Sequence, residues 1–244
     1  QASTGPNPTI PAPDTSLIPT VNVAKSASWP EGVTPKPAAG LAVNAFAGGL
    51  THPRWLYVLP NGDVLAALSN APSNRPDDNT GIRGWVMGVV MSWAGAGVPS
   101  PDKIVLLRDQ DGNGVAETRT DFITGLHSPF GMALIGDQLY VANTDAVLRF
   151  TYQDGATAIS GKGEKVADLP AGTINHHWTK NIIPSPDGSK LYATVGSNSN
   201  VAEHGLEAEE MRAAILEIDL KSGDKRVFAS GLRNPNGMGW EPTT

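Results

Sequence analysis

Two adjacent histidines, His176 and His177, stand between Asn175 and Trp178 and are the strongest candidates for catalytic residues in the sequence. A neutral imidazole can take a proton from a hydroxyl group near neutral pH, so a histidine in a binding site is a candidate general base. On an extended chain neighbouring side chains point to opposite sides, and only one of the pair can then face a shared site. A structural histidine that binds loop carbonyls is the alternative, and the residues alone leave both interpretations open.

A second polar group follows in Gly231–Gly237, whose sequence is Gly-Leu-Arg-Asn-Pro-Asn-Gly. Arg233 offers a planar fork of N–H donors for a carboxylate, and Asn234 can both donate and accept hydrogen bonds. Asn-Pro and Asn-Gly are also ordinary turn formers, in which case Arg233 would be a surface charge. Arg54 and His127 hold equivalent places in two earlier segments. The candidate binding residues are therefore His176, His177, Arg233, Asn234, Arg54 and His127.

The segment Asp109–Glu117 resembles the start of a calcium-binding loop. Oxygen-bearing side chains stand at alternate positions and Gly114 is sixth, the spacing that lets a loop wrap around a cation. The twelfth position is Thr120, where a complete EF-hand loop has a bidentate glutamate. A plain Asp/Asn/Gly turn between strands is the alternative. The candidate calcium ligands are Asp109, Asp111, Asn113 and Glu117.

A recurring unit carries these candidates. Each unit has a polar loop, a short apolar strand, a turn rich in Pro, Gly and Asp, and a second apolar strand, which is typical of a β-hairpin. The units begin near residues 49, 125, 175 and 231, so their starts are roughly 50 to 75 residues apart. Four-stranded propeller blades repeat at about 40 to 50 residues, and insertions would explain the longer spacing. The pattern predicts an all-β protein, a β-propeller with the candidate residues on loops at the blade starts.

Other segments supply the remaining elements. Further strands are expected at 145–150, 165–169, 213–219 and 226–229, and two short helices at 83–94 and 207–212. The acidic residues between 203 and 210 are expected to form a solvated helix face.

The chain divides into two parts of different composition. Residues 1–40 hold eight of the twenty prolines and predict an extended segment, whereas 41–244 predict propeller blades. The last hairpin is cut at Thr244. Because a propeller closes its ring to remove exposed strand edges, we expect the remaining blades to come from further chain or from a second polypeptide.

Composition narrows the classes of function. The 244 residues carry a net charge of −6 and no basic run, which argues against nucleic acid as a partner. The absence of cysteine excludes disulfides and thiol catalysis. No uncharged stretch is long enough to span a membrane. The chain begins with Gln1, and removal of a secretory signal peptide would explain this, so we expect a periplasmic or secreted protein.

Taken together, the sequence resembles the pyrroloquinoline quinone-dependent glucose/sorbosone dehydrogenases, and most of all the L-sorbosone dehydrogenase-like branch. The resemblance runs from about Leu41 to the end of the chain. It is carried by segments 81–87, 109–117, 125–132, 175–177, 207–215 and 228–242.

The resemblance implies a six-bladed propeller of the quinoprotein glucose dehydrogenase type, of which this chain covers about four blades. Pyrroloquinoline quinone and calcium would be its cofactors. His177 falls at the family's general base, and Arg233 with Asn234 at its cofactor-contacting pair, whereas His176 replaces an aspartate. The family's later cofactor-binding residues and its calcium-ligating loop would lie beyond Thr244, so this chain alone is expected to lack part of the site.

The implied activity is oxidation of a sugar-type alcohol, hemiacetal or aldehyde, with hydride transfer to the quinone and an external electron acceptor. The alternative is a non-catalytic propeller that binds a carbohydrate or a protein partner through the same loops. Binding of the quinone distinguishes the two.

Overall fold

A computed structural model describes residues 5–9, 12, 27, 29–30, 32–72, 81–93 and 98–242. The chain divides into two compact units, one of residues 1–28 and 79–97, the other of residues 29–78 and 98–244. Much of the predicted extended segment 1–40 lies outside the described residues, as do Ala94 and Thr244.

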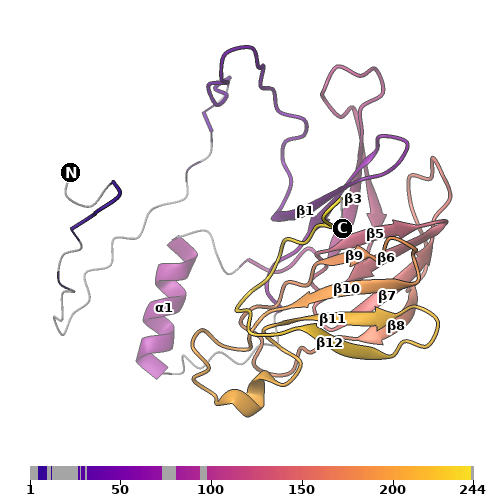
Figure 1. Ribbon diagram of the computed structural model, residues 1–244. Coiled ribbons are helices and arrows are strands. Elements are labelled where there is room, and N and C mark those ends of the chain that lie inside the picture. Colours follow the sequence, from indigo (N-terminus) through magenta and orange to yellow (C-terminus); the bar gives the residue numbers. More distant parts are fainter. Residues whose placement is uncertain are drawn as a thin grey trace. The chain divides into compact units, whose positions relative to one another are not determined.

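The larger unit is built from antiparallel sheets of four strands each, as Figure 1 shows. The first sheet contains β1 (Pro53–Val58), β2 (Val64–Leu68), β3 (Lys103–Arg108) and β4 (Thr118–Ile123). The second contains β5 (Met132–Ile135), β6 (Gln138–Ala142), β7 (Ala146–Thr151) and β8 (Glu164–Asp168). The third contains β9 (Ile182–Pro184), β10 (Lys190–Val195), β11 (Ala214–Asp219) and β12 (Lys225–Ala229).

Hairpin turns set the strand order, because each strand pairs with the next one along the chain. In the first hairpin Gly62 has a φ of 90°, a conformation that glycine adopts without steric cost. The backbone N–H of Gly62 donates to the carbonyl of Leu59 at 2.9 Å, which closes the turn. The adjacent Asp63 binds Arg108 of β3 through two hydrogen bonds of 2.7 Å, so the turn is also tied to the third strand.

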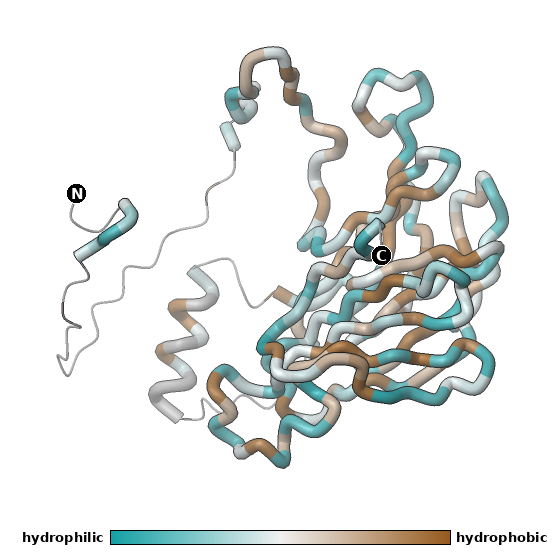
Figure 2. The backbone as a smooth tube through the Cα atoms, in the orientation of Figure 1, coloured by the Kyte–Doolittle hydropathy of each residue, from teal (hydrophilic) through white to brown (hydrophobic). Residues whose placement is uncertain are grey.

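The core lies between neighbouring sheets. Leu65 and Ile104 of the first sheet share one apolar cluster with Leu139 of the second. Val147 of the second sheet shares another cluster with Leu191 of the third. Strands β2, β6 and β10 are buried along nearly their whole length, and Figure 2 shows apolar strands between polar turns. The sheets therefore follow one another face to face, with the second in the middle, as blades do.

An insertion explains the long spacing between the first two units. The helix α1 (Gly81–Trp93) lies in the chain between β2 and β3, close to the predicted bounds of 83–94. No helix in the described part of the chain is long and apolar enough to cross a membrane.

Three sequence predictions need correction. The helix expected over 207–212 is a single short 3-10 turn, η1 (Leu206–Glu209). Its Glu209 does not belong to a solvated face, because its carboxylate accepts from Ser197 Oγ at 2.6 Å and from the N–H of Asn198 at 3.0 Å. The fourth unit, expected to begin near residue 231, contains no strand within the described residues, which end at 242.

The sheets have two chemically different ends. We call the end where β1, β5 and β9 begin the loop end; it includes segments 125–131, 175–181 and 196–200. We call the other end, which carries the turns at 59–63, 136–137 and 185–189, the turn end. Because all the strands are antiparallel, the β3–β4 and β11–β12 turns also lie at the turn end.

Candidate active site at the loop end

His177 lies in the segment that leads into β9 and is half-buried. Its Nδ1 is 2.8 Å from the carbonyl oxygen of Ser197, which follows β10. A carbonyl can only accept, so Nδ1 carries the proton and Nε2 of the neutral ring keeps its lone pair. Burial lowers the pKa of His177, and the positive charge of Arg233 lowers it further. The arrangement therefore favours a neutral imidazole with Nε2 as the basic atom.

A close approach at Gly196 brings the base beside the second polar group. A Cβ atom at this position would collide with Cβ of His177 and would lie 2.7 Å from Oδ1 of Asn234. The next residue, Ser197, donates its backbone N–H to the carbonyl of Arg233 at 2.7 Å. The end of β10 thus fixes both His177 and the Arg233-Asn234 pair.

Arg233 and Asn234 are available for a ligand. Arg233 is exposed, and its Nε and Nη2 donate to the backbone and side-chain oxygens of Asn200 at 3.0 and 2.7 Å. These two bonds hold the guanidinium and leave its remaining N–H groups unused by the described residues. Oδ1 of Asn234 is buried and has no hydrogen-bond partner in the same part of the chain. The guanidinium suits an anionic or carbonyl oxygen of a ligand, and the unpaired Oδ1 suits an N–H or O–H donor of the same ligand.

Two further candidates lie close to His177. His176 is half-buried, its backbone N–H donates to the carbonyl of Asn198 at 3.1 Å, and its charge contributes to the lowered pKa of His177. The guanidinium of Arg54 lies over the ring of Trp178, 5.3 Å from its centroid. The structure therefore brings the first sheet's Arg54 to the histidine segment of the third.

His127 lies at the same end of the second sheet. Its Nδ1 is 2.8 Å from Oδ2 of Asp145, and both side chains are about half exposed. This hydrogen bond joins His127 to Asp145 of its own sheet and not to His177. The following Ser128 is buried, has a φ of 45° before a proline, and its Oγ has no partner among the described residues. Strained backbone of this type is common in functional loops.

The Asp109 loop folds as a compact turn at the opposite end. Carboxylate oxygens of Asp109, Asp111 and Glu117 lie within 4.8 Å of one another, so three of the four predicted ligands are close together. The carboxylate of Asp109 accepts from the backbone N–H groups of Gly112, Asn113 and Gly114, and these bonds lower its pKa. The amide of Asn113 donates to Glu117 at 3.3 Å. The loop connects β3 to β4 at the turn end, so it cannot share a site with His177, and calcium binding there stays a prediction.

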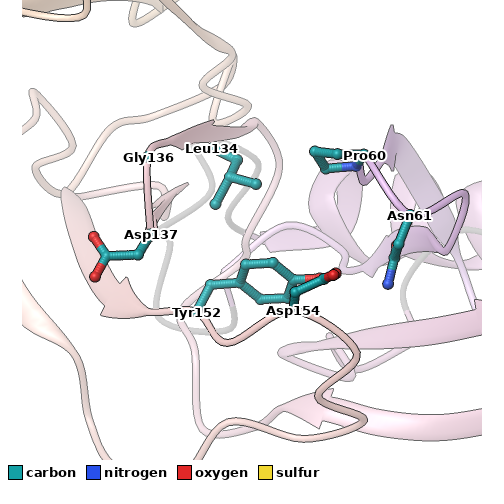
Figure 3. A pocket seen from close by; sticks show the side chains of 7 residues that line it. All are labelled: Pro60, Asn61, Leu134, Gly136, Asp137, Tyr152 and Asp154. Carbon is teal, nitrogen blue, oxygen red and sulfur yellow. The ribbon is translucent and has the colours of Figure 1, made fainter.

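A cavity without any signal in the sequence also lies at the turn end. It has a volume of about 370 Å³ and is lined by residues of the first two sheets (Figure 3): Pro60, Asn61, Leu134, Gly136, Asp137, Tyr152 and Asp154. The hydroxyl of Tyr152 donates to Asp154 at 3.2 Å, and burial raises the pKa of Tyr152. The cavity is separate from the histidine segment.

Sequence reasoning missed two groups that hold the histidine segment. Lys180, three residues after His177, is completely buried, and Arg212 is almost so. Gly196 and Ser197 were missed as well, although their place directly after an apolar strand marks them as the end of a hairpin. Lysine is rarely buried. A lysine that stands between a histidine pair and the apolar Ile182 was therefore the one sign in the sequence that this position is unusual.

Comparison with known proteins gives a family and a fold. The model of the TrAA12-like family matches residues 103–244, which is more than half of the chain. No curated protein matches the sequence.

Solved structures resemble the chain at low identity. The pyranose dehydrogenase PQQ domain from Coprinopsis cinerea, in its holo form, is 17% identical, with a TM-score of 0.56 over 78% of this chain and 41% of that one. The iodide structure of the Trichoderma reesei AA12 enzyme is 18% identical, with a TM-score of 0.52 over 76% and 40%. An oxidoreductase from Thermus thermophilus, described as a glucose dehydrogenase, is 22% identical, with a TM-score of 0.54 over 84% and 59%.

The chain spans about two fifths of the length of the first two proteins. At these identities the likeness shows the fold alone. The four-stranded antiparallel sheets are those of the propeller predicted from the sequence. The number of six blades stays a prediction. The family model covers β3 and β4, all of the second and third sheets, and the segments that carry His177 and Arg233, so the chain belongs to the TrAA12-like family.

Proposed function

We propose that the chain carries the proton-accepting part of a quinoprotein sugar dehydrogenase. The observation that carries the proposal is the state of His177. Its Nδ1 is hydrogen-bonded to the carbonyl of Ser197 at 2.8 Å, and the pKa of the imidazole is lowered. The ring is therefore neutral near pH 7, and its Nε2 is free of a proton and can act as a base. Membership of the TrAA12-like family and the fold shared with the PQQ domain of pyranose dehydrogenase support the same function.

The residues around His177 fit pyrroloquinoline quinone. The quinone bears carboxylates and carbonyl oxygens, and the exposed N–H groups of Arg233 suit such acceptors. Asn234 contributes an amide whose buried Oδ1 has no partner among the described residues, and whose NH₂ can donate. Arg233 and Asn234 would hold the quinone, with His176 and Arg54 as further contacts. When bound, the quinone supplies the hydride acceptor for an alcohol carbon.

The chain's own residues account for the proton. Nε2 of His177 accepts the proton of the substrate hydroxyl and becomes an imidazolium, while Nδ1–H keeps its bond to Ser197. The fixed Ser197 carbonyl stabilises the positive charge and holds the ring in one orientation. Arg233 faces the negative charge of the ligand, so the two functions are divided between adjacent segments.

The finer parts of the proposal follow the sequence resemblance. We propose a sugar-type alcohol, hemiacetal or aldehyde as substrate, with sorbosone-like compounds among those to test, and an external electron acceptor. We also propose calcium as a second cofactor, a periplasmic or secreted location, and additional blades from further polypeptide. That last point is supported by the chain's coverage of only about two fifths of the pyranose dehydrogenase domain.

Reconstitution tests the function. The complete protein, including the polypeptide that supplies the remaining blades, is titrated with pyrroloquinoline quinone in the presence of calcium, and binding is followed by quinone absorbance. Reduction of a dye acceptor is then measured with a panel of aldoses, alcohols and aldehydes. We expect Arg233→Ala to weaken quinone binding, and His177→Ala to retain binding while losing roughly 100-fold or more in turnover.

Arg119→Ala is the matched control, because this exposed arginine of β4 donates to the backbone carbonyls of Gly48 and Gly49 and to no other described residue. Quinone binding without dye reduction by any substrate would contradict the catalytic proposal. Failure to bind quinone, combined with binding of a carbohydrate, would favour the non-catalytic propeller.

A further inference from the structure

The side chain of Lys180 is completely buried beneath the histidine segment. Its Nζ lies 3.4 Å from the carbonyl oxygen of His177 and 3.4 Å from that of Trp178. No carboxylate of the described residues forms an ion pair with it. Burying an amino group without a charged partner costs free energy of folding. Its hydrogen-bond acceptors within the described chain are two carbonyl oxygens of the segment that carries His177.

The backbone of Lys180 is fixed by the second sheet. Its carbonyl accepts from the N–H of Gly131 at 2.9 Å. The contact is so close that a Cβ at Gly131 would lie 2.7 Å from Cα of Asn181 and 2.6 Å from the nitrogen of Ile182. These contacts fix the backbone of Lys180 against the neighbouring sheet. From this fixed position its side chain extends toward the carbonyl oxygens of the preceding residues His177 and Trp178.

A buried chain of hydrogen bonds holds the same segment from the other side. The hydroxyl of Thr144 donates to the carbonyl of Trp178 at 2.9 Å and accepts from Nδ2 of Asn175 at 2.9 Å. Nη1 of Arg212 donates to Oδ1 of Asn175 at 3.2 Å. Thr144 thus shares the carbonyl of Trp178 with Lys180, whereas for the carbonyl of His177 the structure shows Lys180 as the donor.

We propose that Lys180 is a positioning residue for His177. By holding the carbonyl oxygens of His177 and Trp178, which lie on either side of residue Trp178, it keeps the imidazole bonded to Ser197 and Nε2 directed at the substrate. The inference rests on the proposed role of His177 as the base. It assigns a function to a buried lysine that neither the family match nor the likeness to solved structures accounts for.

The protonation state of Lys180 is consistent with this task. Burial, and after it the charge of Arg212, lower its pKa to about 7, while the charge of Asp145 acts in the opposite direction. A neutral amine still has two N–H donors, one for each carbonyl. The hold on His177 therefore persists when the amine loses its proton, while the strength of both bonds changes with the charge.

Nuclear magnetic resonance of the quinone-free full chain tests the proposal without relying on activity. The imidazole signals of His177, assigned with His177→Ala, are titrated in the wild type, in Lys180→Met and in Lys180→Gln. We expect Lys180→Met to raise the pKa of His177 toward that of an exposed histidine and to speed exchange of its Nδ1–H by about tenfold or more, because a loosened ring becomes hydrated. Lys180→Gln should restore part of both values, since its amide can donate.

Lys190→Met is the matched control, because Lys190 lies at the turn end of the same sheet and pairs with Glu217 at 2.8 Å. It should leave His177 unchanged. If Lys180→Met alters thermal stability but neither the pKa of His177 nor its Nδ1–H exchange, Lys180 is merely structural and the proposal is wrong.

A measurement on the wild type covers the case in which Lys180→Met does not fold. The carbonyl ¹³C signals of His177 and Trp178 should shift together with a midpoint near pH 7, at the pKa of about 7 of Lys180. Carbonyl signals that stay constant while the Nζ signal of Lys180 itself titrates would also overturn the proposal.

Activity is the separate arm. In reconstituted enzyme we expect Lys180→Met to lower kcat roughly tenfold with little change in KM, as a misplaced catalytic group does. If the wild type shows no activity at all, the function of His177 is refuted, and the magnetic resonance result still decides whether Lys180 positions the ring.

Discussion

The two ends of the sheets treat their polar groups in opposite ways. At the turn end, Asp63 is bonded to Arg108 and Asn61, and Asp187 accepts from Ser185 and Ser189. At the loop end, by contrast, buried side-chain oxygens have no partner among the described residues: Ser128 Oγ, Asn143 Oδ1, Asn198 Oδ1 and Asn234 Oδ1.

The difference shows where ligand chemistry is expected. A buried polar atom without a partner costs free energy, so a fold tolerates several of them at one end only where another molecule can satisfy them. The turn end uses acidic residues to close its own turns. Asp63 and Asp187 of the turn end are therefore structural by their contacts, whereas the amides and cations of the loop end are available for binding.

The largest expected effect comes from filling the close approach at the loop end. Gly196→Ala adds a methyl group where Cβ of His177 and Oδ1 of Asn234 already meet the backbone. Overpacking should cost about 1–3 kcal/mol of stability, and displacement of the base should lower turnover roughly 100-fold. Steady-state kinetics and chemical denaturation measure the two effects.

Gly48→Ala is the control for that variant, since Gly48 has open space around it and no unusual φ. Equal activity of Gly196→Ala and Gly48→Ala would mean that the loop end can rearrange, and the proposed geometry would be refuted.

Breaking the turn end should affect stability without affecting binding. Asp63 is almost fully buried and makes two 2.7 Å bonds to Arg108. We expect Asp63→Asn to lower the free energy of unfolding by about 2 kcal/mol, because a partly buried guanidinium loses its charged partner. Quinone affinity should stay at the wild-type value. A parallel loss of quinone affinity would show that the two ends are not independent.

Acid should weaken the turn end. The side-chain bonds of Lys190 and Arg226 lower the pKa of Glu217 from 4.5 to about 2. Stability from a carboxylate with a lowered pKa is complete above its unfolded value and is lost as the pH falls through the folded one. The melting temperature of the wild type should therefore drop between about pH 4.5 and pH 2, and that of Glu217→Gln should drop less. Identical pH profiles for the two proteins would contradict this assignment.

The smallest expected effect concerns Arg54. Its contact with Trp178 is a cation–π interaction between the first and third sheets, 5.3 Å from the ring centroid. Arg54→Met should cost about 0.5–1 kcal/mol of stability, which chemical denaturation can resolve. A simultaneous fall in quinone affinity would support Arg54 as a contact of the quinone, and an unchanged affinity would make it a purely structural contact.

Much of the fold follows from local sequence signals. Pro186-Asp187-Gly188 and the Lys221–Asp224 turn each stand between two apolar runs, and both hairpins form within a residue or two of the predicted positions. The turn residues dictate backbone geometry directly, which is why such signals succeed. The unit pattern also predicts that His177, Arg233 and Asn234 lie together, because they begin successive units.

The remaining features depend on contacts between sheets. The backbone of Lys180 is held by Gly131, which leads into the second sheet, and nothing near Lys180 in the sequence encodes that contact. The loop spacing predicts that the acidic groups around Asp109 are neighbours, but their location at the turn end follows only when strand directions are traced through β3. The charge pattern puts Glu209 on a solvated face wrongly, since its partners Ser197 and Asn198 stand more than ten residues earlier in the chain.

The segment between β2 and β3 leaves the first sheet and returns to it at neighbouring positions, which hydrogen bonds hold together. Leu68 and Lys103 are paired in the ladder, and just beyond them Asn70 donates its backbone N–H to Ser100 Oγ at 2.9 Å and its side-chain amide to the carbonyl of Val98 at 2.6 Å. Chain that leaves and returns at adjacent ladder positions can change in length without altering the sheet's register. This position therefore suits insertions, whether they arise in evolution or by engineering. The segment that contains α1 could be lengthened, shortened or exchanged while the first sheet keeps the same hydrogen bonds.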